Sequence, residues 1–417
     1  MISVENMINL YKRRIIKNRA NRIALLAIIF MLAGIMGCIS PTGTTTGCGG
    51  PAAQGWSGFV SADGILYVGS MDGNLLAIDP SARSSGIGFP GSEKEWISDE
   101  VKVEAAAGGM CGPMFTCGRA ASTGALIYSS PVVSEEYVYI ATYSGNDGQL
   151  YALYLEDKVA GEIGQRYPVQ GDGIGKVVGN IVFDKDTIYI ASSNGNVYAI
   201  DAEYVVRRWE VKITDERIWT APAVSDGIVY VGSYDGKLHA LDADDGSLLW
   251  EKELPSPMAS SPVCHDNVLL FGAFDRYLYA VDKTSGDILW QFKGNNWFWA
   301  APVVQDNTVY AGCLDNVVYA VDIATGNEVW RFDAGDKIVS RPVITDNRLV
   351  VVSESGELYS LDAGNGSLLK QVTIDATVMS PLYADGDNVY VHGRNDTVYA
   401  IDLQEARIIW ELNTKIE

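Results

Sequence analysis

Carboxylates and cysteines are the residues of this chain whose types and spacing could support chemistry. Five aspartates each lie seven residues before the end of a repeating segment: Asp72, Asp147, Asp235, Asp275 and Asp315. Gathered on one face, such carboxylates could bind Ca²⁺. They lack the dense ligand spacing of a calcium loop, however, and aspartate in a turn commonly hydrogen-bonds to the turn backbone. We therefore predict a structural role for them, and no catalytic residue, cofactor-binding residue or metal ligand.

The six cysteines fall into separate groups. Cys111 and Cys117 lie in a Gly/Ala-rich insertion, and in an oxidising compartment we expect a disulfide between them. Metal ligation is the alternative, although no histidine accompanies them. Cys48 could be unpaired or a further partner. Cys264 and Cys313 fall in predicted strands of different repeats, where we expect inert core thiols.

The first 55 residues predict export and anchoring. A basic stretch precedes an apolar run from Ile23 to Met36, the order found in a signal peptide, and fourteen apolar residues are short for a spanning helix. The segment from Ala33 to Cys38 looks like a lipobox in which Cys38 would be lipidated. We therefore expect a signal peptide over 1–37 and a flexible spacer over 38–55, with an uncleaved signal anchor as the alternative. Either places the rest outside the cytoplasm, anchored to the cell membrane.

A repeat of about forty residues organises the rest of the chain. It is marked by an aspartate after an apolar run, at Asp201, Asp242, Asp282, Asp322, Asp362 and Asp402. Two degraded copies lie earlier, at Leu75–Asp79 and Leu150–Tyr154, which makes eight. Constant self-similarity at this period indicates that one supersecondary unit is copied and stacked.

Each repeat encodes four short strands, as the segment from Thr220 to Trp250 shows. Asp226-Gly227 and Asp235-Gly236 separate alternating apolar runs, and Asp-Gly between such runs is a strong hairpin signal. Four-stranded antiparallel units of this period can close into a ring that protects their edges. We therefore predict an all-β fold, an eight-bladed β-propeller over 56–417, with an insertion at about 80–125.

A tryptophan recurs eight residues after the repeat aspartate in the pattern Ala-x-Asp-x-x-x-Gly-x-x-x-Trp, at Trp209, Trp250, Trp290, Trp330 and Trp410. This pattern resembles the tryptophan-docking motif of the eight-bladed propellers of pyrroloquinoline quinone (PQQ) enzymes and their non-enzymatic relatives, over roughly residues 56 to 413. The resemblance implies that each indole wedges between adjacent blades. Repeat seven has Lys370 instead and repeat two has no clear equivalent, so we expect those two junctions to be the weakest. WD40 propellers are the rival architecture, but their Trp-Asp dipeptide is missing from the repeat ends.

The same resemblance raises the possibility of an enzyme. Quinoprotein dehydrogenases of this family hold PQQ beside Ca²⁺ on the propeller axis, next to a disulfide between adjacent cysteines. This sequence has no adjacent cysteine pair, and repeats three to eight keep to 40 or 41 residues, which leaves no long insertions to build such a pocket. Since the protein must supply the groups that bind a cofactor, we expect no cofactor and no enzyme activity. A PQQ- and Ca²⁺-dependent dehydrogenase is kept as an alternative.

The segments that join repeats carry aromatic and cationic residues suited to a ligand or partner: Trp219, Asn295, Asn296, Trp297, Phe298, Trp299 and Arg341. Trp219 and Trp299 hold equivalent positions, three residues before Pro222 and Pro302. These residues could simply pack between blades. Alternatively, they form a patch on one face that binds a peptide, a glycan or a protein.

The charge balance excludes some partners. The formal net charge is −21, and an acidic surface repels nucleic acid and anionic lipid. The chain resembles BamB-type lipoproteins, which serve outer-membrane protein assembly. That resemblance implies a non-enzymatic, extracytoplasmic scaffold whose partners are other envelope proteins or peptides, with a surface receptor for a ligand as a further alternative.

Overall fold

The structure is a computed structural model, and it describes residues 57–70, 72–84, 88–98, 126–144, 147–155, 160–169 and 173–415. The chain divides into two compact units, Met1–Ala53 and Gln54–Glu417, and the described residues all belong to the second. The predicted signal peptide, spacer and lipidated Cys38 lie outside the described residues. So do Cys48, Cys111 and Cys117, and with them the predicted disulfide. Among the described residues, no helix is long and apolar enough to cross a membrane.

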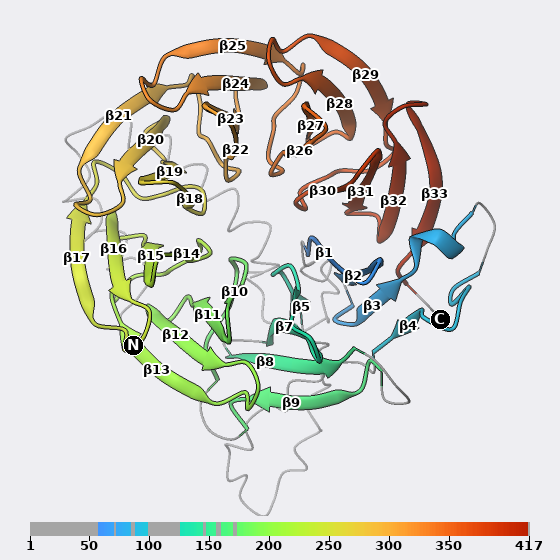
Figure 1. The fold of residues 1–417 in the computed structure, drawn as a ribbon, viewed down its shortest axis with the longest axis horizontal. Coiled ribbons are helices and arrows are strands. Elements are labelled where there is room, and N and C mark those ends of the chain that lie inside the picture. Colours follow the sequence, from blue (N-terminus) through green and yellow to red (C-terminus); the bar gives the residue numbers. More distant parts are fainter. Residues whose placement is uncertain are drawn as a thin grey trace, which may run out of the picture. The chain divides into compact units, whose positions relative to one another are not determined.

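The described residues of the second unit form eight antiparallel sheets arranged around a common axis (Figure 1). Blade 1 contains β1 (Phe59–Ala62), β2 (Ile65–Gly69), β3 (Leu75–Ile78) and β4 (Trp96–Ile97), with the short helix η1 (Pro80–Ala82) after its third strand. Blade 2 contains β5 (Leu126–Ile127), β6 (Val132–Val133), β7 (Tyr137–Ser144), β8 (Asp147–Tyr154) and β9 (Ile163–Tyr167). Both β5 and β6 pair with β7, so together they take the place of one innermost strand.

Blades 3 to 8 repeat one four-stranded meander. Blade 3 contains β10 (Val182–Asp184), β11 (Thr187–Ala191), β12 (Asn196–Asp201) and β13 (Arg207–Lys212). Blade 4 contains β14 (Ala223–Ser225), β15 (Ile228–Gly232), β16 (Lys237–Asp242) and β17 (Leu248–Glu253). Blade 5 contains β18 (Val263–His265), β19 (Val268–Gly272), β20 (Tyr277–Asp282) and β21 (Ile288–Lys293). The described strands of every blade are consecutive in the sequence.

Three further blades complete the ring. Blade 6 contains β22 (Val303–Gln305), β23 (Thr308–Gly312), β24 (Val317–Asp322) and β25 (Glu328–Asp333). Blade 7 contains β26 (Val343–Thr345), β27 (Arg348–Val352), β28 (Glu357–Asp362) and β29 (Leu368–Thr373). Blade 8 contains β30 (Tyr383–Asp385), β31 (Asn388–Gly393), β32 (Thr397–Asp402) and β33 (Arg407–Asn413). The prediction of an all-β, eight-bladed propeller is confirmed.

The core lies between the blades. Buried apolar side chains form eight clusters, and each cluster combines residues of two adjacent blades, including blade 8 with blade 1. The second and third strands are therefore covered on both faces, which explains their near-continuous apolar sequence; all five residues of β11 are buried. The fourth strands form the rim and alternate, as in β13, where Trp209 is buried between exposed neighbours.

The ring closes by side-chain packing. Phe59 and Leu66 of blade 1 share a cluster with Trp410 and Leu412 of blade 8. The buried His392 adds a contact, with 3.4 Å between its Nδ1 and the carbonyl oxygen of Ser57. Because β1–β4 and β30–β33 each form a sheet from one continuous stretch, the described strands show no exchange between the first and last blades.

The docking tryptophans lie at the junctions between blades. Trp209 donates its indole N–H to the carbonyl oxygen of Ala243 in blade 4 at 2.9 Å, and Trp330 donates to Ala363 in blade 7 at 2.9 Å. Each indole stands opposite a small residue of the third strand, as Ala240 stands opposite Trp250. In blades 3 to 8, a β-bulge follows the residue of the third strand at this position. That residue is Ser360 in blade 7 and alanine in the other five blades.

A glycine of the next blade lies under each of five indoles. Gly246 and Gly366 adopt φ values of 75° and 72°, and a Cβ atom on them would come within 2.8 Å of Trp209 and 2.5 Å of Trp330. The other three pairs are Gly161 with Trp96, Gly286 with Trp250 and Gly326 with Trp290. A left-handed residue without a side chain is therefore needed at these positions for the indole to approach.

Two junctions lack the tryptophan, and they are the two that the sequence singled out. Register pairing puts Gln165 of β9 in the tryptophan position, opposite Ala152, and Lys370 of β29 opposite Ser360. The residues that replace the receiving glycine are Val205 and Ala406, at φ 49° and 53°. Tryptophan and glycine are lost together at these two junctions, whereas Trp410 at the junction of blades 8 and 1 has no described glycine under it.

Candidate functional site

The inter-blade segments and the turns between second and third strands emerge on one face of the propeller, which we call the loop face. In blades 3 to 8, a backbone hydrogen bond ties each such turn to the segment that precedes its blade. The donor N–H and acceptor C=O groups, 2.8 to 3.1 Å apart, belong to Ser193 and Lys176, Tyr234 and Arg217, Phe274 and Pro257, Leu314 and Trp297, Glu354 and Lys337, and Arg394 and Thr377. The loop face is therefore a rigid, repeated frame on which the side chains differ.

Aromatic side chains form a continuous arc on blades 4 to 6 of this face. Trp219 meets Tyr234 edge-on with ring centroids 4.8 Å apart, and Tyr234 meets Phe274 at 5.7 Å. Phe274 in turn contacts Trp297 at 5.1 Å and Trp299 at 6.1 Å. These five residues, which we call the aromatic arc, are all partly exposed. Edge-to-face pairs of this kind stabilise one another and hold their rings in fixed orientations.

The arc combines two residues that sequence reasoning missed with three that it named. Tyr234 and Phe274 directly precede the turn aspartates Asp235 and Asp275, so an alignment of the repeats could have found them. The corresponding residues of blades 6 to 8 are Leu314, Glu354 and Arg394. The aromatic character of this position is therefore confined to blades 4 and 5.

The remaining residues of the 295–299 segment have structural contacts. Phe298 is fully buried between Phe292 and Tyr319, with centroid distances of 6.3 and 5.8 Å. Asn296 donates to the carbonyl oxygen of Leu314 at 3.2 Å. The backbone N–H of Asn295 donates to a carboxylate oxygen of Asp315 at 3.0 Å. Phe298 thus belongs to the core and not to the surface, and Asn295 and Asn296 anchor the loop that presents Trp297 and Trp299.

Two arginines add positive charge to the loop face. The guanidinium carbon of Arg217 lies 5.9 Å from the ring centroid of Trp219, within cation–π range. Burial in the surrounding protein raises the pKa of Tyr234 to about 12, and Arg217 partly offsets this increase. Arg341 precedes the innermost strand of blade 7, and part of its side chain is exposed to solvent. Desolvation by the surrounding protein lowers the pKa of its guanidinium group.

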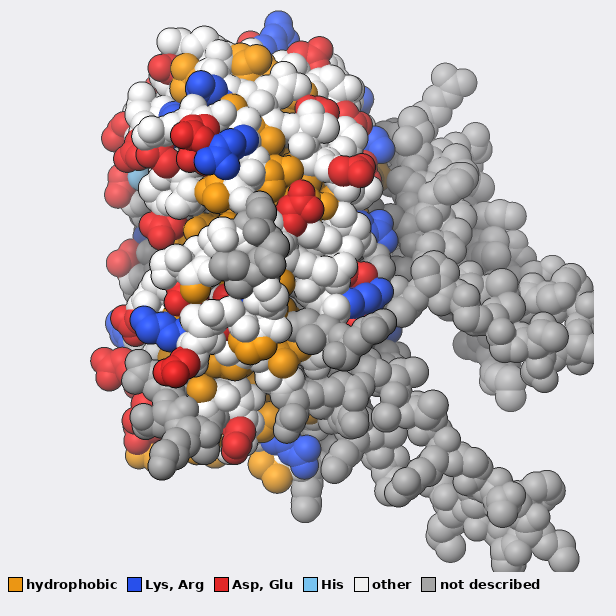
Figure 2. All heavy atoms as spheres, turned by 90° about the vertical axis from the view of Figure 1, so that its right-hand side faces the viewer, with side chains coloured by type: hydrophobic (Ala, Val, Ile, Leu, Met, Phe, Trp, Pro, Cys, Tyr) orange, Lys and Arg blue, Asp and Glu red, His pale blue; other side chains and the backbone are white. Residues whose placement is uncertain are grey.

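The opposite face, formed by the turns between first and second and between third and fourth strands, is acidic. Asp226, Asp266, Asp306 and Asp346 hold equivalent positions in its turns, with φ between 46° and 53°. In the side view of Figure 2, acidic side chains are dense along the left edge. No group of three histidine, cysteine, aspartate or glutamate residues that could hold a metal ion occurs among the described residues.

The predicted turn aspartates act within the backbone. Asp235, Asp275 and Asp315 accept hydrogen bonds from the N–H groups two residues later at 3.0, 3.2 and 3.2 Å. Asp275 and Asp315 also accept from the hydroxyl groups of Tyr279 and Tyr319 at 2.5 and 2.8 Å. Their carboxylate oxygens are thereby committed to the turns, as the sequence predicted for these three.

The residues that lead into the innermost strands are mostly small or apolar. The residues just before the innermost strands are Gly58, Ser130, Asn180, Ala221, Ser261, Ala301, Arg341 and Pro381. Several of them contact each other across blades; Ser130 N–H donates to Asn180 Oδ1 at 2.9 Å and Ala221 N–H to Ser261 Oγ at 2.8 Å. This described set contains no carboxylate that could ligate Ca²⁺.

Two described cysteines are free thiols. Cys264 lies in β18 and is partly buried, and burial raises its pKa to about 11. Cys313 is buried one residue beyond the end of β23, not within the strand as the sequence predicted, and burial raises its pKa to about 12. Thiols with raised pKa values are poor nucleophiles at neutral pH.

The fold is an eight-bladed propeller whose loop face carries a partly exposed aromatic arc. The family model described as "Beta-alanine-activating enzyme, beta-propeller" matches residues 119–403, well over half of the chain, and the chain belongs to this propeller family. No curated protein matches the sequence.

Solved structures share the fold at low sequence identity. BamB from Moraxella catarrhalis is 16% identical, with a TM-score of 0.59 over 81% of this chain and 91% of that chain. The computationally designed Ika8 protein is also 16% identical, with a TM-score of 0.65 over 83% of this chain and 96% of that chain. At this identity the likeness concerns the fold alone.

Proposed function

We propose that this chain is a non-enzymatic, extracytoplasmic, lipid-anchored propeller that acts as a protein-interaction scaffold of the cell envelope. The observation that carries the proposal is the aromatic arc with Arg217 at its end. Rigid, partly exposed aromatic residues beside an arginine are the composition of binding hot spots. The sequence resemblance to BamB-type lipoproteins and the shared fold of a BamB structure support the same role.

The loop face suits a protein or peptide better than a small molecule undergoing chemistry. The described residues place a row of contacting rings there, the turn aspartates are hydrogen-bonded within their turns, and burial raises the pKa of both free thiols. The acidic opposite face disfavours anionic partners. We therefore infer that partners bind across blades 4 to 6 on the loop face.

The test is capture of partners from the native host with a tagged protein. Replacing Trp219→Ala and Trp299→Ala together should remove the captured proteins, because two neighbouring anchors are lost, while circular dichroism and thermal unfolding stay close to the parent. The control is Leu289→Ala, which removes an exposed apolar side chain of β21 from the rim, away from the loop face. Capture that survives the double substitution would contradict the loop-face assignment.

The anchoring part of the proposal has its own test. Cys38→Ala should move the protein from the membrane fraction to the soluble extracytoplasmic fraction and abolish labelling by a fatty-acid analogue. Membrane retention without labelling would favour the uncleaved signal anchor.

The family name includes an enzyme, so a direct test of the dehydrogenase alternative is needed. PQQ and Ca²⁺ are added to the purified protein, and quinone absorbance and dye-linked alcohol oxidation are followed. We expect no saturable cofactor binding and no oxidation above the rate without protein. Stoichiometric binding of PQQ with turnover would overturn the non-enzymatic assignment.

A further inference from the structure

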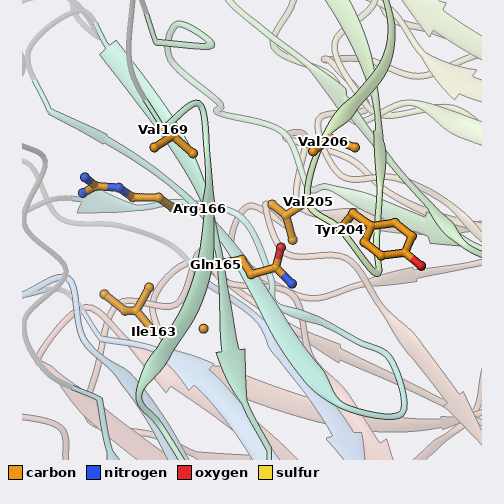
Figure 3. Close-up of a pocket in the computed structure, with 8 residues that line it drawn as sticks. Ile163, Gln165, Arg166, Val169, Tyr204, Val205 and Val206 are labelled. Atoms are coloured by element: carbon orange, nitrogen blue, oxygen red, sulfur yellow. The ribbon is translucent and has the colours of Figure 1, made fainter.

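The junction between blades 2 and 3 lacks its indole and leaves an open hollow at the rim. A cavity of about 440 Å³ is lined by Ile163, Gly164, Gln165, Arg166, Val169, Tyr204, Val205 and Val206. Figure 3 shows the side chains of Gln165 on β9 and Val205 on the facing turn directed toward each other across this space. The hollow therefore occupies the junction at which other blades place a docking tryptophan.

The walls of the hollow are apolar and exposed. Ile163, Val169, Tyr204 and Val206 have relative exposures of 41%, 66%, 63% and 53%, so four of the ten most exposed large hydrophobic residues of the described chain surround one site. Clustered exposed apolar residues mark interaction sites more often than scattered ones do.

A hydrogen-bond acceptor at this junction is used by fewer donors than its equivalents at two junctions that hold an indole, those of blades 3 and 4 and of blades 6 and 7. At the junction of blades 3 and 4, the carbonyl oxygen of Ala243 accepts from both Tyr189 Oη and Trp209 Nε1. At the open junction, the equivalent carbonyl of Ala202 accepts from Tyr139 Oη at 2.7 Å. The amide of Gln165 donates one residue further along, to the carbonyl oxygen of Glu203 at 2.8 Å. The short glutamine therefore replaces only part of what the indole supplies at those two junctions.

The backbone beside the hollow is a sheet edge. Among the described strands, β9 pairs with β8 alone and is the outermost strand of blade 2. An added strand would lie about 4.8 Å from β9, and the residue opposite Gln165 would place its side chain on the face of the hollow. The next residue would place its side chain on the other face of the strand, where Figure 3 shows Arg166 extending away from Gln165.

The charge of the site selects among possible strands. Arg166 is the one charged residue among the described residues that line the hollow, in a chain whose formal net charge is −21. A partner carboxylate next to Arg166 would therefore be attracted locally, while most of the surrounding surface would repel it.

We propose that the open junction of blades 2 and 3 is a docking site for an extended peptide segment of another protein, in which an aromatic residue is followed by an acidic one. The segment adds as a strand to the edge of β9. Its aromatic ring fills the hollow left by the missing docking tryptophan, and its carboxylate faces Arg166. This mode combines main-chain pairing, which gives affinity, with two side-chain contacts, which give specificity.

The probe is an eight-residue peptide of alternating threonine and valine with a central tryptophan–aspartate pair, titrated into the protein by fluorescence polarisation. We expect saturable binding that is about tenfold or more weaker when the tryptophan of the peptide is replaced by alanine. Gln165→Trp should fill the hollow and weaken binding by a similar factor. Arg166→Glu should make the peptide with lysine in place of aspartate the better ligand.

Matched variants make the result decisive. Lys370→Trp adds an indole at the other departing junction and should leave peptide binding unchanged, as should Trp219→Ala on the loop face. The second comparison separates this site from the proposed scaffold surface. Equal binding of the tryptophan and alanine peptides, or full binding by a folded Gln165→Trp protein, would refute the proposal. So would self-association in sedimentation velocity that Gln165→Trp abolishes, because the occupant would then be a second copy of this chain.

Discussion

The junction between blades 3 and 4 and the junction between blades 2 and 3 are built from strands at equivalent positions, but different side chains pack in them. At the first, Trp209 lies on Gly246 and bonds to Ala243. At the second, Gln165 faces Val205 and a hollow opens to solvent. Both nevertheless keep their apolar cluster of second and third strands. The apolar clusters between blades thus hold the ring together. Residues at the rim can therefore serve binding instead of packing between blades.

The largest expected contrast comes from removing an indole. Trp330→Ala should lower the free energy of unfolding by about 3–5 kcal/mol, because a buried tryptophan and its hydrogen bond are lost and a cavity remains. Lys370→Ala at the exposed equivalent position should change it by less than about 0.5 kcal/mol. Equilibrium urea unfolding at 25 °C measures both. Equal losses would mean that the indoles do not hold the blades.

The receiving residue offers the next contrast. Gly366→Val should cost about 2–3 kcal/mol, since a Cβ atom would clash with Trp330 and the φ of 72° disfavours a branched residue. Val205→Gly removes the left-handed strain but also buried contacts, and should stay within about 1 kcal/mol of the parent. The same unfolding assay decides, and a neutral Gly366→Val would contradict the contact between glycine and indole.

The closing junction of blades 8 and 1 should respond to pH. Burial lowers the pKa of His392, with smaller opposing effects from Ser57 and Asp396. The unfolded chain binds a proton below about pH 6.5 and the folded chain does not, so stability is retained above that pH and falls as the pH decreases, by up to about 1.4 kcal/mol per pH unit.

His239 is also buried with a lowered pKa and adds to the same slope. His392→Gln should therefore reduce, but not abolish, the loss of melting temperature between pH 7 and pH 5. An unchanged profile would show that the pKa of His392 is the same in the folded and unfolded chains.

The smallest expected effect is a gain. Gln165→Trp combined with Val205→Gly rebuilds the tryptophan-on-glycine junction at blades 2 and 3. The free energy of unfolding should rise by about 1 kcal/mol, because the gain from burying the indole exceeds the loss of the contacts that Gln165 and Val205 make now. Thermal unfolding compares it with the parent. A clear loss of stability would mean that the neighbouring turn cannot accept an indole.

Features of this protein that repeat along the chain could be predicted from the sequence. The period, the four strands of each blade and the two departing junctions at Lys370 and in repeat two all follow from a pattern copied along the chain. The joint change of glycine to Val205 and Ala406 was present in the same pattern and was overlooked. Phe298 shows the limit: it lies between Trp297 and Trp299 in sequence, yet it is buried while they reach the surface.

The sequence alone determined the all-β class, the number of blades and the residues that could join them, because each repeat carries its own turns and its own apolar strands. Only the tertiary structure decided which aromatic residues meet on the loop face and which junction stays open. Trp219, Tyr234 and Phe274 become neighbours through the stacking of blades 4 and 5, and the hollow exists because Gln165 and Val205, forty residues apart, face each other across a junction. Contacts between blades depend on side chains from two repeats at once, and no single repeat encodes them.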